Sequence, residues 1–499
     1  MILKTSQPLS WLGQVDSKTG EILGDHELKG KNLKGTDFEF PCASGSTVGS
    51  YVINELKANG VAPSRITFTS KPDSITAWGA ILAGIPMNVQ GKSLKTINIS
   101  ELRKNNVPEE LMEMIHKVGQ IFDYNDFIPV RSVQVAGVSY KTIAESGLNT
   151  LKYLSGKYKV RTPGSAFLNP AGMDLVNWKE QGIPEGFAKK QLEIMECFKK
   201  MGILPTCTCT PYLIGIFEPP GTELHWSESS AVCFANSVLG MRTNREGGIA
   251  SLVYALAGYG PRWGYHLDEN RNPTFEIKFE GKLKSSADYG ILGHIIGERV
   301  KDGVPYIRGI HPEANELPFM KDRLKALGAA AAASGAVALF HAEGITPEAR
   351  LKTISFGGIK ETMTITEKDI SERKAKLSTA NYDELNLVAF GCPHASQAEI
   401  EEIARYIKGR KLKQGKKLWV CTSRQVKAWS DSMGYVKTIE DAGGKVYCDT
   451  CMVVAPISDM GFSCTGSCSG KAVCYLPTLG KQKKVLIDDT KTLIEKVTD

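Results

Sequence analysis

The chain has 499 residues, of which 42% are hydrophobic and 23% charged, and its 12 cysteines are far fewer than a disulfide scaffold carries. A chain of this length buries a core without covalent staples, so we expect free or metal-bound thiols in a reducing cytoplasm. The net charge of +7 is spread thinly along the sequence, which argues against a nucleic-acid-binding protein.

Neither the first residues nor the longest apolar run predicts export or membrane insertion. Residues 1–13 contain no apolar segment behind a basic start and no small-residue cleavage site. The run Ala329–Phe340 is too short to cross a bilayer. The densest basic run, Lys408–Lys417, is interpreted as a solvated loop. We therefore expect a cytoplasmic globular protein that binds neither membranes nor nucleic acid.

The first ninety residues differ in pattern from the rest. Short β-rich runs alternate with glycine turns up to Gly35, and the segment P-C-A-S-G-S-T-V-G-S-Y (41–51) follows. The apparent strand Arg65–Ser70 then leads into a run of small residues. This pattern predicts a small, mainly β domain over residues 1–90. The polar segment 91–108 is expected to be a linker, and residues 109–499 a larger second domain.

The larger domain shows its clearest pattern between residues 384 and 456. Three apolar runs, Leu385–Phe390, Leu418–Cys421 and Val446–Cys448, read as strands, and helical patterns over Gln397–Ile407 and up to Met433 separate them. Alternation of strand and helix at this spacing predicts a parallel sheet with right-handed crossovers.

Several chemically active side chains come directly after these strands. Ligands bind beyond the carboxyl ends of strands in such sheets. Cys392, the turn Thr422–Arg424 and Cys451 each follow a predicted strand. We expect them to lie along one edge of the sheet.

The cysteine spacing near the C-terminus allows more than one interpretation. Cys448, Cys451, Cys464 and Cys468 spell C-x2-C-x12-C-x3-C, which is compatible with a zinc site of four thiolates. A redox dithiol is less compatible, because the pair does not open a helix after a first strand. Cys448 alone reads as a small buried hydrophobe.

An iron site is the other interpretation. Cys207 and Cys209 lie two residues apart in a β-rich run that ends at a proline, and Cys209 is nearer to the end of that run. Three thiolates from three strand ends would leave iron an open position for Lewis-acid chemistry.

The segment H-W-S-E-S-S-A-V-C-F-A-N-S-V-L-G-M-R-T-N-R-E-G-G (225–248) resembles the aconitase X family. The N-terminal segment 41–51 is similar to the small swivel partner of that family, here fused ahead of the large one. Further matching segments are A-G-V-S-Y-K-T-I (136–143), T-C-T-P-Y (208–212), F-G-C-P-H-A-S (390–396) and D-T-C (449–451). The resemblance covers nearly the whole chain.

This resemblance implies an α/β fold, in which a β-rich swivel domain docks on a multi-lobed aconitase-like α/β/α body. It implies a hydro-lyase that acts on a small hydroxy acid at an iron–sulfur centre held by Cys209, Cys392 and Cys451. A [2Fe-2S] cluster is expected ahead of a [4Fe-4S] cluster or a single iron. Ser46 matches the serine that acts as the proton-abstracting base; by itself it reads as a turn or a phosphate-binding loop.

The remaining site residues are expected around that centre. Glu228 is a candidate to orient a metal-bound water or to pair with arginines. Candidates to bind the substrate are Arg242, Asn244, Arg245, Ser423, Arg424 and Lys471. Bidentate arginines suit a carboxylate, although an arginine is more often a structural ion-pair partner.

Two substrates are known for the family. The fused arrangement favours dehydration of cis-3-hydroxy-L-proline to Δ1-pyrroline-2-carboxylate, and mevalonate 5-phosphate is the alternative. A zinc-stabilised binding protein without catalysis is the hypothesis from a different class. If the protein is an enzyme, its site is expected in the cleft between the two domains, and pivoting of the small domain is expected to exclude water.

Overall fold

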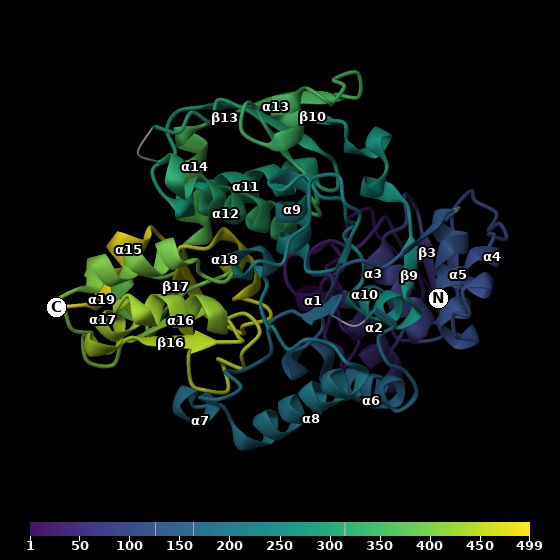
Figure 1. Cartoon of the computed structure of the whole chain (residues 1–499), viewed down its shortest axis with the longest axis horizontal. Helices are drawn as coiled ribbons and strands as arrows, with labels where there is room; N and C mark the ends of the chain where they lie inside the picture. Colours follow the sequence, from purple (N-terminus) through teal and green to yellow (C-terminus); the bar gives the residue numbers. More distant parts are fainter. Residues whose placement is uncertain (125, 163, 314–315) are drawn as a thin grey trace.

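The computed structural model describes residues 1–124, 126–162, 164–313 and 316–499. The chain forms an N-terminal part and three further lobes, each built on a mainly parallel sheet with helices packed against it. In Figure 1 the N-terminal part is purple, the second lobe is green at the top and the third lobe runs to yellow on the left. The predicted α/β fold is confirmed.

The N-terminal part contains a four-stranded parallel sheet in the order β1-β2-β3-β4. Its strands are β1 (Ile2–Lys4), β2 (Asp37–Phe40), β3 (Arg65–Phe68) and β4 (Met87–Val89), and its helices are α1 (Trp11–Gln14), α2 (Gly49–Ala58) and α3 (Ser74–Leu82). The glycine-rich stretch up to Gly35 forms turns and isolated bridges, such as Val15 with Ile22. Helices α2 and α3 make the crossovers that parallel pairing requires.

The core of this part is aromatic and continues into the next lobe. Trp11 packs edge-on against Phe38 and Phe40, with ring centroids 5.9 and 5.8 Å apart. The same hydrophobic cluster extends to the buried helix α10 (Gly248–Ala257). The segment predicted as a linker, 91–108, holds helix α4 (Ser100–Lys104) and contributes buried apolar side chains to this cluster. The N-terminal part is therefore packed against the body over a shared core.

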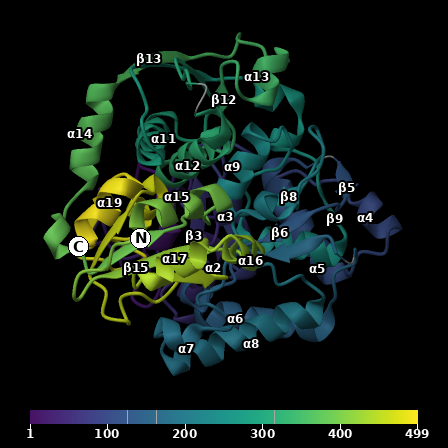
Figure 2. The same ribbon diagram turned by 60° about the vertical axis from the view of Figure 1, so that its left-hand side comes forward.

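The first lobe has a three-stranded parallel sheet in the order β7-β6-β8 and a two-stranded antiparallel sheet of β5 and β9. The strands are β5 (Phe127–Pro129), β6 (Val133–Val135), β7 (Ala166–Leu168), β8 (His225–Trp226) and β9 (Tyr259–Pro261). Besides α10, its helices include α5 (Glu109–Phe122), α6 (Tyr140–Lys157), α7 (Trp178–Gln181), α8 (Glu185–Met201) and α9 (Ser229–Ser237). Helices α6 and α8 lie side by side in Figures 1 and 2.

The second lobe is organised around two closely packed helices, α11 (Ser286–Val300) and α12 (Met320–Ser334). A methyl group on Gly293 would lie 2.1 Å from the Leu327 carbonyl oxygen, so only glycine permits this approach. Its parallel sheet has the order β12-β11-β10-β13. The remaining elements are β10 (Phe275–Glu280), β11 (Pro305–Arg308), β12 (His341–Ala342), α13 (Pro347–Leu351), β13 (Glu361–Thr366) and α14 (Glu367–Leu377).

The third lobe confirms the parallel sheet predicted for residues 384–456. Its order is β16-β15-β14-β17-β18, and every neighbouring pair is parallel. The strands are β14 (Leu387–Phe390), β15 (Lys417–Thr422), β16 (Lys445–Cys448), β17 (Cys464–Ser467) and β18 (Lys484–Ile487). The helices are α15 (Gln397–Ile407), α16 (Arg424–Ser432), α17 (Tyr435–Asp441), α18 (Gly470–Tyr475) and α19 (Thr490–Val497).

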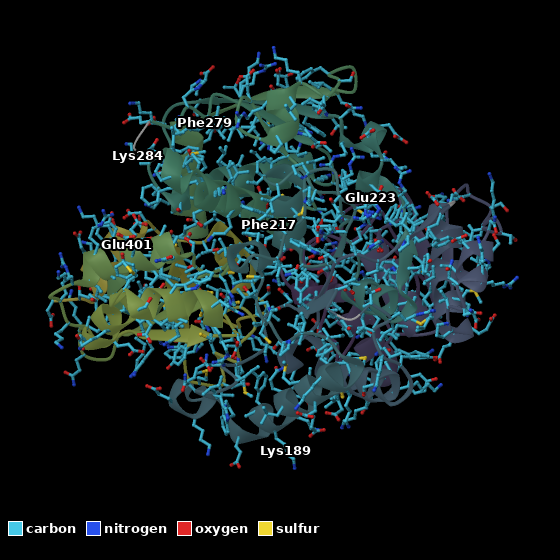
Figure 3. The ribbon with its side chains drawn as sticks, viewed as in Figure 1. Lys189, Phe217, Glu223, Phe279, Lys284 and Glu401 are labelled. Atoms are coloured by element: carbon cyan, nitrogen blue, oxygen red, sulfur yellow. The ribbon has the colours of Figure 1, made fainter. Side chains whose placement is uncertain are left out.

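The surface carries many charged side chains; those of Lys189 and Lys284 point outward in Figure 3. Across the described ranges, none of the helices combines the length and apolar character needed to span a bilayer.

One aromatic side chain, that of Tyr51, contributes to the docking of the N-terminal part on the body. Tyr51 on α2 is fully buried and lies against three glycines of the first lobe. A methyl group on Gly137, Gly147 or Gly248 would lie 2.3, 3.2 or 3.3 Å from the ring of Tyr51. The missing side chains of these glycines make the groove that holds the tyrosine.

We predict that Tyr51→Ala lowers the free energy of unfolding by about 3–5 kcal/mol, the range for deleting a large buried aromatic side chain. Tyr51→Phe is the matched control. Among the described residues its hydroxyl has no hydrogen-bond partner, so removing that group costs little or stabilises the protein. Guanidinium titration followed by circular dichroism measures both variants. Equal destabilisation by the two would contradict a packing role for the ring.

Candidate active site

A small cavity of about 60 Å³ lies where the N-terminal part meets the first and third lobes. Residues of helices α1, α9 and α18 line it, and these three helices lie near the middle of Figure 1. Three cysteines, a serine, a glutamate and a lysine from four distant segments line it together. These six residues are Ser46, Cys209, Glu228, Cys392, Cys451 and Lys471.

The three cysteines reach the cavity from separate loops. Cys392 follows β14, Cys451 follows β16, and Cys209 precedes the short helix Pro211–Ile214. Each side chain is at most 6% exposed. The Cys392 thiol donates a hydrogen bond to the sulfur of Cys451, which lowers the pKa of Cys451 to about 7; backbone N–H groups that follow it act in the same direction. Burial raises the pKa of Cys209 to about 12.

His394 ties the loops of these cysteines together. Its backbone N–H donates to Sγ of Cys209 at 3.3 Å. Its Nε2 donates to the Thr450 carbonyl at 2.9 Å, and its Nδ1 accepts from the Thr208 hydroxyl at 3.0 Å. Burial lowers the pKa of His394 to about 4, so the ring is neutral at physiological pH. This histidine therefore positions the segments beside Cys209 and Cys451.

Glu228 and Lys471 form a buried ion pair at the cavity wall, with 2.6 Å between Oε1 and Nζ. The Ser230 hydroxyl and the Ala231 N–H donate to the other carboxylate oxygen at 2.6 and 2.7 Å. Burial alone would raise the pKa of Glu228, but the Lys471 ammonium and these donors hold it below its ordinary value. Burial likewise disfavours the charged form of Lys471. The attraction of the Glu228 carboxylate is larger than this effect of burial, so the pKa of Lys471 is raised. Both groups are therefore charged.

Ser46 comes from the N-terminal part, yet it lines the same cavity as the thiols. It follows Gly45, whose φ of +74° few other residues adopt. The Val48 N–H points at the Ser46 hydroxyl oxygen, 3.4 Å away. A glycine turn thus brings the serine from one domain to the cysteines of another.

Among the described residues, the N-termini of α2, α6 and α9 lie at the cavity, as does that of the short helix α18, which carries Lys471. Val48 is the N-cap of α2, Thr142 lies in the first turn of α6, and Ser229 is the first residue of α9; all three line the cavity. Helix N-termini present free N–H groups and a partial positive charge. Together with Lys471 they make a cavity that favours anionic groups.

Asn169 and Ser229 are among the lining residues that the sequence pattern did not single out. Asn169 follows β7 in an Asn-Pro turn, and no hydrogen-bond partner for its buried Oδ1 is found among the described residues. Ser229 directly follows Glu228. In the sequence, Asn169 is a polar residue that follows a short apolar run. This pattern is too common in proteins to mark the residue as part of a site. The signal for Ser229 was its place beside Glu228 in the segment 225–248.

Of the two neighbouring cysteines 207 and 209, Cys209 lines the cavity. Cys207 is fully buried in the core shared by the N-terminal part and the first lobe, where its φ is +45°. Their spacing of two in a β-rich run predicts that the two thiols share one face; this prediction is wrong, because the backbone turns at Cys207.

The four-thiolate zinc site is not compatible with this topology. Cys448 and Cys451 lie at the carboxyl end of β16, whereas Cys464 begins β17 at the opposite edge of the same parallel sheet. A four-residue strand spans about 10 Å or more, well beyond the reach of one zinc ion. In the described ranges, no three His, Cys, Asp or Glu side chains lie close enough together to hold a single ion.

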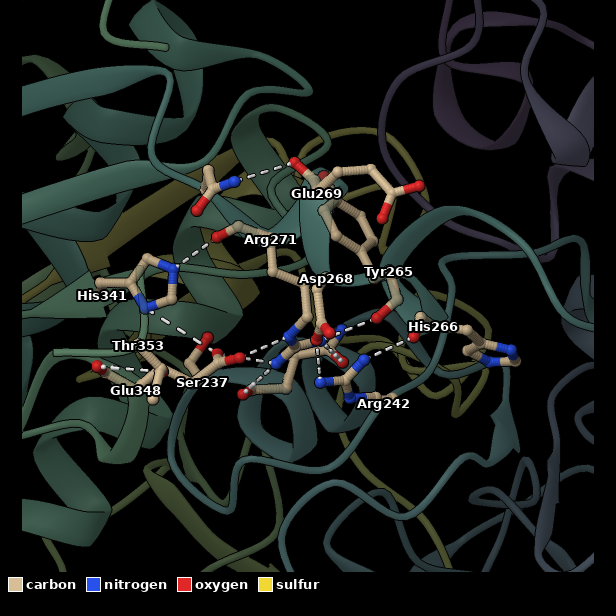
Figure 4. A network of polar contacts seen from close by, with 12 residues as sticks. Ser237, Arg242, Tyr265, His266, Asp268, Glu269, Arg271, His341, Glu348 and Thr353 are labelled. Carbon is tan, nitrogen blue, oxygen red and sulfur yellow. Dashed lines mark hydrogen bonds and ion pairs between the residues drawn. The ribbon is translucent and has the colours of Figure 1, made fainter. Parts of the chain in front are cut away.

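Most predicted substrate-binding residues lie outside the thiol cavity. Arg242 pairs with Asp268 and donates to the His266 carbonyl at 2.7 Å (Figure 4). Arg424 pairs with the buried carboxylates of Asp174 and Asp449. Asp174 and Asp449 would be strongly destabilising without a cation, which explains why Arg424 is committed to them, whereas Asp268 is exposed. Neither arginine lines the thiol cavity.

The other predicted ligands have local roles or face a different cleft. The Ser423 hydroxyl caps α16 by accepting the Val426 N–H at 3.2 Å. Asn244 and Arg245 line a larger cleft of about 840 Å³, between the N-terminal part and the first and second lobes. The smaller cavity is the better candidate for chemistry, because the cysteines, Ser46 and the Glu228–Lys471 pair all face it.

Family descriptions match almost the whole chain. Residues 1–108 match "Aconitase X swivel domain", 98–269 "Aconitase X first domain", 273–375 "Aconitase X second domain" and 385–499 "Aconitase X third domain". A crystal structure of Thermococcus kodakaraensis aconitase X in its holo-form is 38% identical, with a TM-score of 0.70 over 78% of this chain and 95% of that one.

Similar proteins of known activity fall into two groups. The large subunit of phosphomevalonate dehydratase from Methanocaldococcus jannaschii is 47% identical over 77% of this chain and 94% of its own length. The small subunit of that enzyme from Thermococcus sibiricus is 42% identical over 21% of this chain and 78% of its length. A cis-3-hydroxy-L-proline dehydratase from Pseudomonas aeruginosa is 29% identical over 95% of this chain and 90% of its length.

We predict that Lys471→Met destabilises the protein by about 3–5 kcal/mol, because it leaves the buried Glu228 carboxylate without its cation. The double variant Glu228→Gln/Lys471→Met removes both charges and recovers most of that loss. Denaturant titration of the two variants measures the difference. A double variant as unstable as the single one would contradict a buried charged pair.

Proposed function

The chain belongs to the aconitase X family and is a hydro-lyase, and on this premise we propose that it dehydrates mevalonate 5-phosphate. Both parts of the chain resemble the corresponding subunits of phosphomevalonate dehydratases, at clearly higher identity than the hydroxyproline enzyme. The chain then joins in one polypeptide what those relatives divide between two subunits.

The observation that carries this proposal is the convergence of three helix N-termini and Lys471 on one cavity. Mevalonate 5-phosphate carries a carboxylate and a phosphate, and both groups suit such an environment. Cis-3-hydroxy-L-proline instead carries an ammonium group beside its carboxylate, and the partial positive charge of the helix N-termini disfavours a cation there.

Cis-3-hydroxy-L-proline is the second candidate substrate. It is favoured by domain organisation, since the hydroxyproline dehydratase relative aligns with nearly the whole of this chain, swivel domain included. The choice between the two substrates is therefore open to a direct assay.

Cys209, Cys392 and Cys451 would hold the iron–sulfur cluster that the family implies. Three sulfurs face one cavity and two of them are in contact, but they are not gathered around a single ion, so the donor set suits a cluster of several irons better than one metal ion. When bound, the cluster supplies a Lewis acid that assists departure of the substrate hydroxyl.

Ser46 is proposed as the base. It takes a proton from the methylene carbon beside the substrate carboxylate, the hydroxyl leaves the neighbouring carbon, and a carbon–carbon double bond forms. The abstracted proton and the departing hydroxide together make the released water. Serine is a weak base, so it needs cations and N–H groups nearby; Lys471 and the N-terminus of α2 supply them.

Lys471 would contribute a fixed positive charge for the substrate carboxylate, and Glu228 would keep that lysine protonated. A cavity of 60 Å³ is far smaller than the roughly 300–1,000 Å³ of typical ligand sites. The N-terminal part would therefore move away to admit substrate, and its return would exclude water from the reacting groups.

The test is an assay of anaerobically purified, iron-reconstituted protein with each substrate separately, followed by NMR of the products. We expect an olefinic product from mevalonate 5-phosphate and no turnover of cis-3-hydroxy-L-proline. Ser46→Ala is expected to lower kcat by about 10²–10⁴-fold, the contribution of a positioned base, while iron content is unchanged. Ser44→Ala is the matched control, because Ser44 does not line the cavity. Turnover of hydroxyproline alone would overturn the substrate assignment.

We predict that Cys392→Ser loses the iron and its visible absorption after anaerobic reconstitution. Cys421→Ser is the control, since this buried thiol lies within β15 and does not line the cavity. Iron per chain and the absorption spectrum are measured for both variants. Retention of iron by Cys392→Ser would exclude this cysteine as a ligand.

A further inference from the structure

The loop that carries Ser46 is held from outside its own domain. The carbonyl of Gly45, which belongs to the peptide bond entering Ser46, accepts a hydrogen bond from the Arg245 guanidinium. The carbonyl of Thr47 accepts the N–H of Gly248 at 2.9 Å. The carbonyl groups of the residues before and after the serine, Gly45 and Thr47, are thus bound by one short segment of the first lobe, Arg245–Gly248.

A third contact comes from the second lobe. The N–H of Gly45 donates to the carbonyl of Gly335, at the C-terminal end of α12, over 3.2 Å. Gly45 itself fits tightly, because a methyl group there would lie 2.5 Å from the Ser10 hydroxyl. Both polar groups of this glycine are therefore used to fasten the loop to the body.

The segment Arg245–Gly248 is itself rigidly placed. Glu246 is buried and accepts the Tyr254 hydroxyl at 2.6 Å and the Trp263 Nε1–H at 3.4 Å. A methyl group on Gly248 would lie 3.1 Å from the Ala136 carbonyl oxygen. Because its neighbours leave so little room, the segment presents its donors to the Ser46 loop in one arrangement.

Arg245 lines the larger cleft and not the thiol cavity. Its Nε is buried, and no hydrogen-bond partner for it is found among the described residues. The Gly45 carbonyl is the hydrogen-bond acceptor that its guanidinium engages in this structure. The side chain thus donates a hydrogen bond to the loop of the proposed base, and among the described residues it makes none to Cys209, Cys392 or Cys451.

We propose that Arg245 is a positioning residue: its guanidinium, bound to the Gly45 carbonyl, holds Ser46 at the thiol cavity, with the Gly248 N–H as a second fastening. This inference rests on the proposed role of Ser46 as the base. It replaces direct binding of the substrate carboxylate by Arg245 with an action through the backbone of the catalytic loop.

The experiment compares Arg245→Met and Arg245→Lys with Arg262→Met in the iron-reconstituted protein. Arg262 lines the same large cleft but pairs with Glu223, so it is the matched control. We expect Arg245→Met to lower kcat by about 10²-fold, the effect of misplacing a reacting group by about 1 Å, with little change in KM. Arg245→Lys recovers part of kcat, and Arg262→Met leaves kcat unchanged.

Hydrogen exchange of the intact protein supplies a readout that needs neither substrate nor activity. Amides of residues 41–52 are expected to exchange faster in both Arg245 variants than in the parent protein, and unchanged in Arg262→Met. Unaltered exchange in both Arg245 variants would overturn the proposal even if activity fell. A rise in KM with kcat preserved would also overturn it, because that result marks a substrate ligand. If exchange is faster in the Arg245 variants but the Ser46→Ala protein is active, Ser46 is not the base. The role of Arg245 in holding the loop would still be supported.

Discussion

The buried ion pair between Glu228 and Lys471 is the interaction on which the candidate site depends. It joins the start of α9 in the first lobe to α18 in the third, across 243 residues of sequence. Two charges removed from water are tolerated only with close pairing and further donors, which Ser230 and the Ala231 N–H provide. The need for close pairing holds the first and third lobes together at this point, and the cavity lies between them.

The Glu228–Lys471 ion pair and the sheet of the third lobe together position the cysteines. Ser469, the N-cap of α18, donates its hydroxyl to the Cys392 carbonyl, so the helix that carries Lys471 also holds a cysteine loop. His394 then links the loops of Cys209 and Cys451 through three hydrogen bonds. The proposed iron ligands and the proposed substrate-binding lysine therefore share one framework of buried polar contacts.

The N-terminal part completes the site because it can pack closely against the body. The ring of Tyr51 occupies a groove made by glycines, and the loop of Ser46 is bound by Arg245 and the Gly248 N–H. As a member of the aconitase X family that carries its swivel domain in the same chain, the protein keeps the loop of Ser46 tethered to the lobes that bear the cysteines. Covalent linkage raises the effective concentration of one domain at the other without any new contact.

The amino-acid sequence by itself determined the α/β class, the parallel pairing of the three strands between residues 384 and 456 and the place of Cys392 and Cys451 after two of them. These features depend on hydrophobic periodicity and turn residues, which are local. Only the tertiary structure decided that Arg424 pairs with Asp174, that Cys464 lies at the opposite sheet edge from Cys448, and that Asn169 lines the cavity. These contacts join buried charges and polar groups from segments far apart in the sequence. Which groups pair is decided by the tertiary packing that brings those segments together, and local sequence patterns do not encode it.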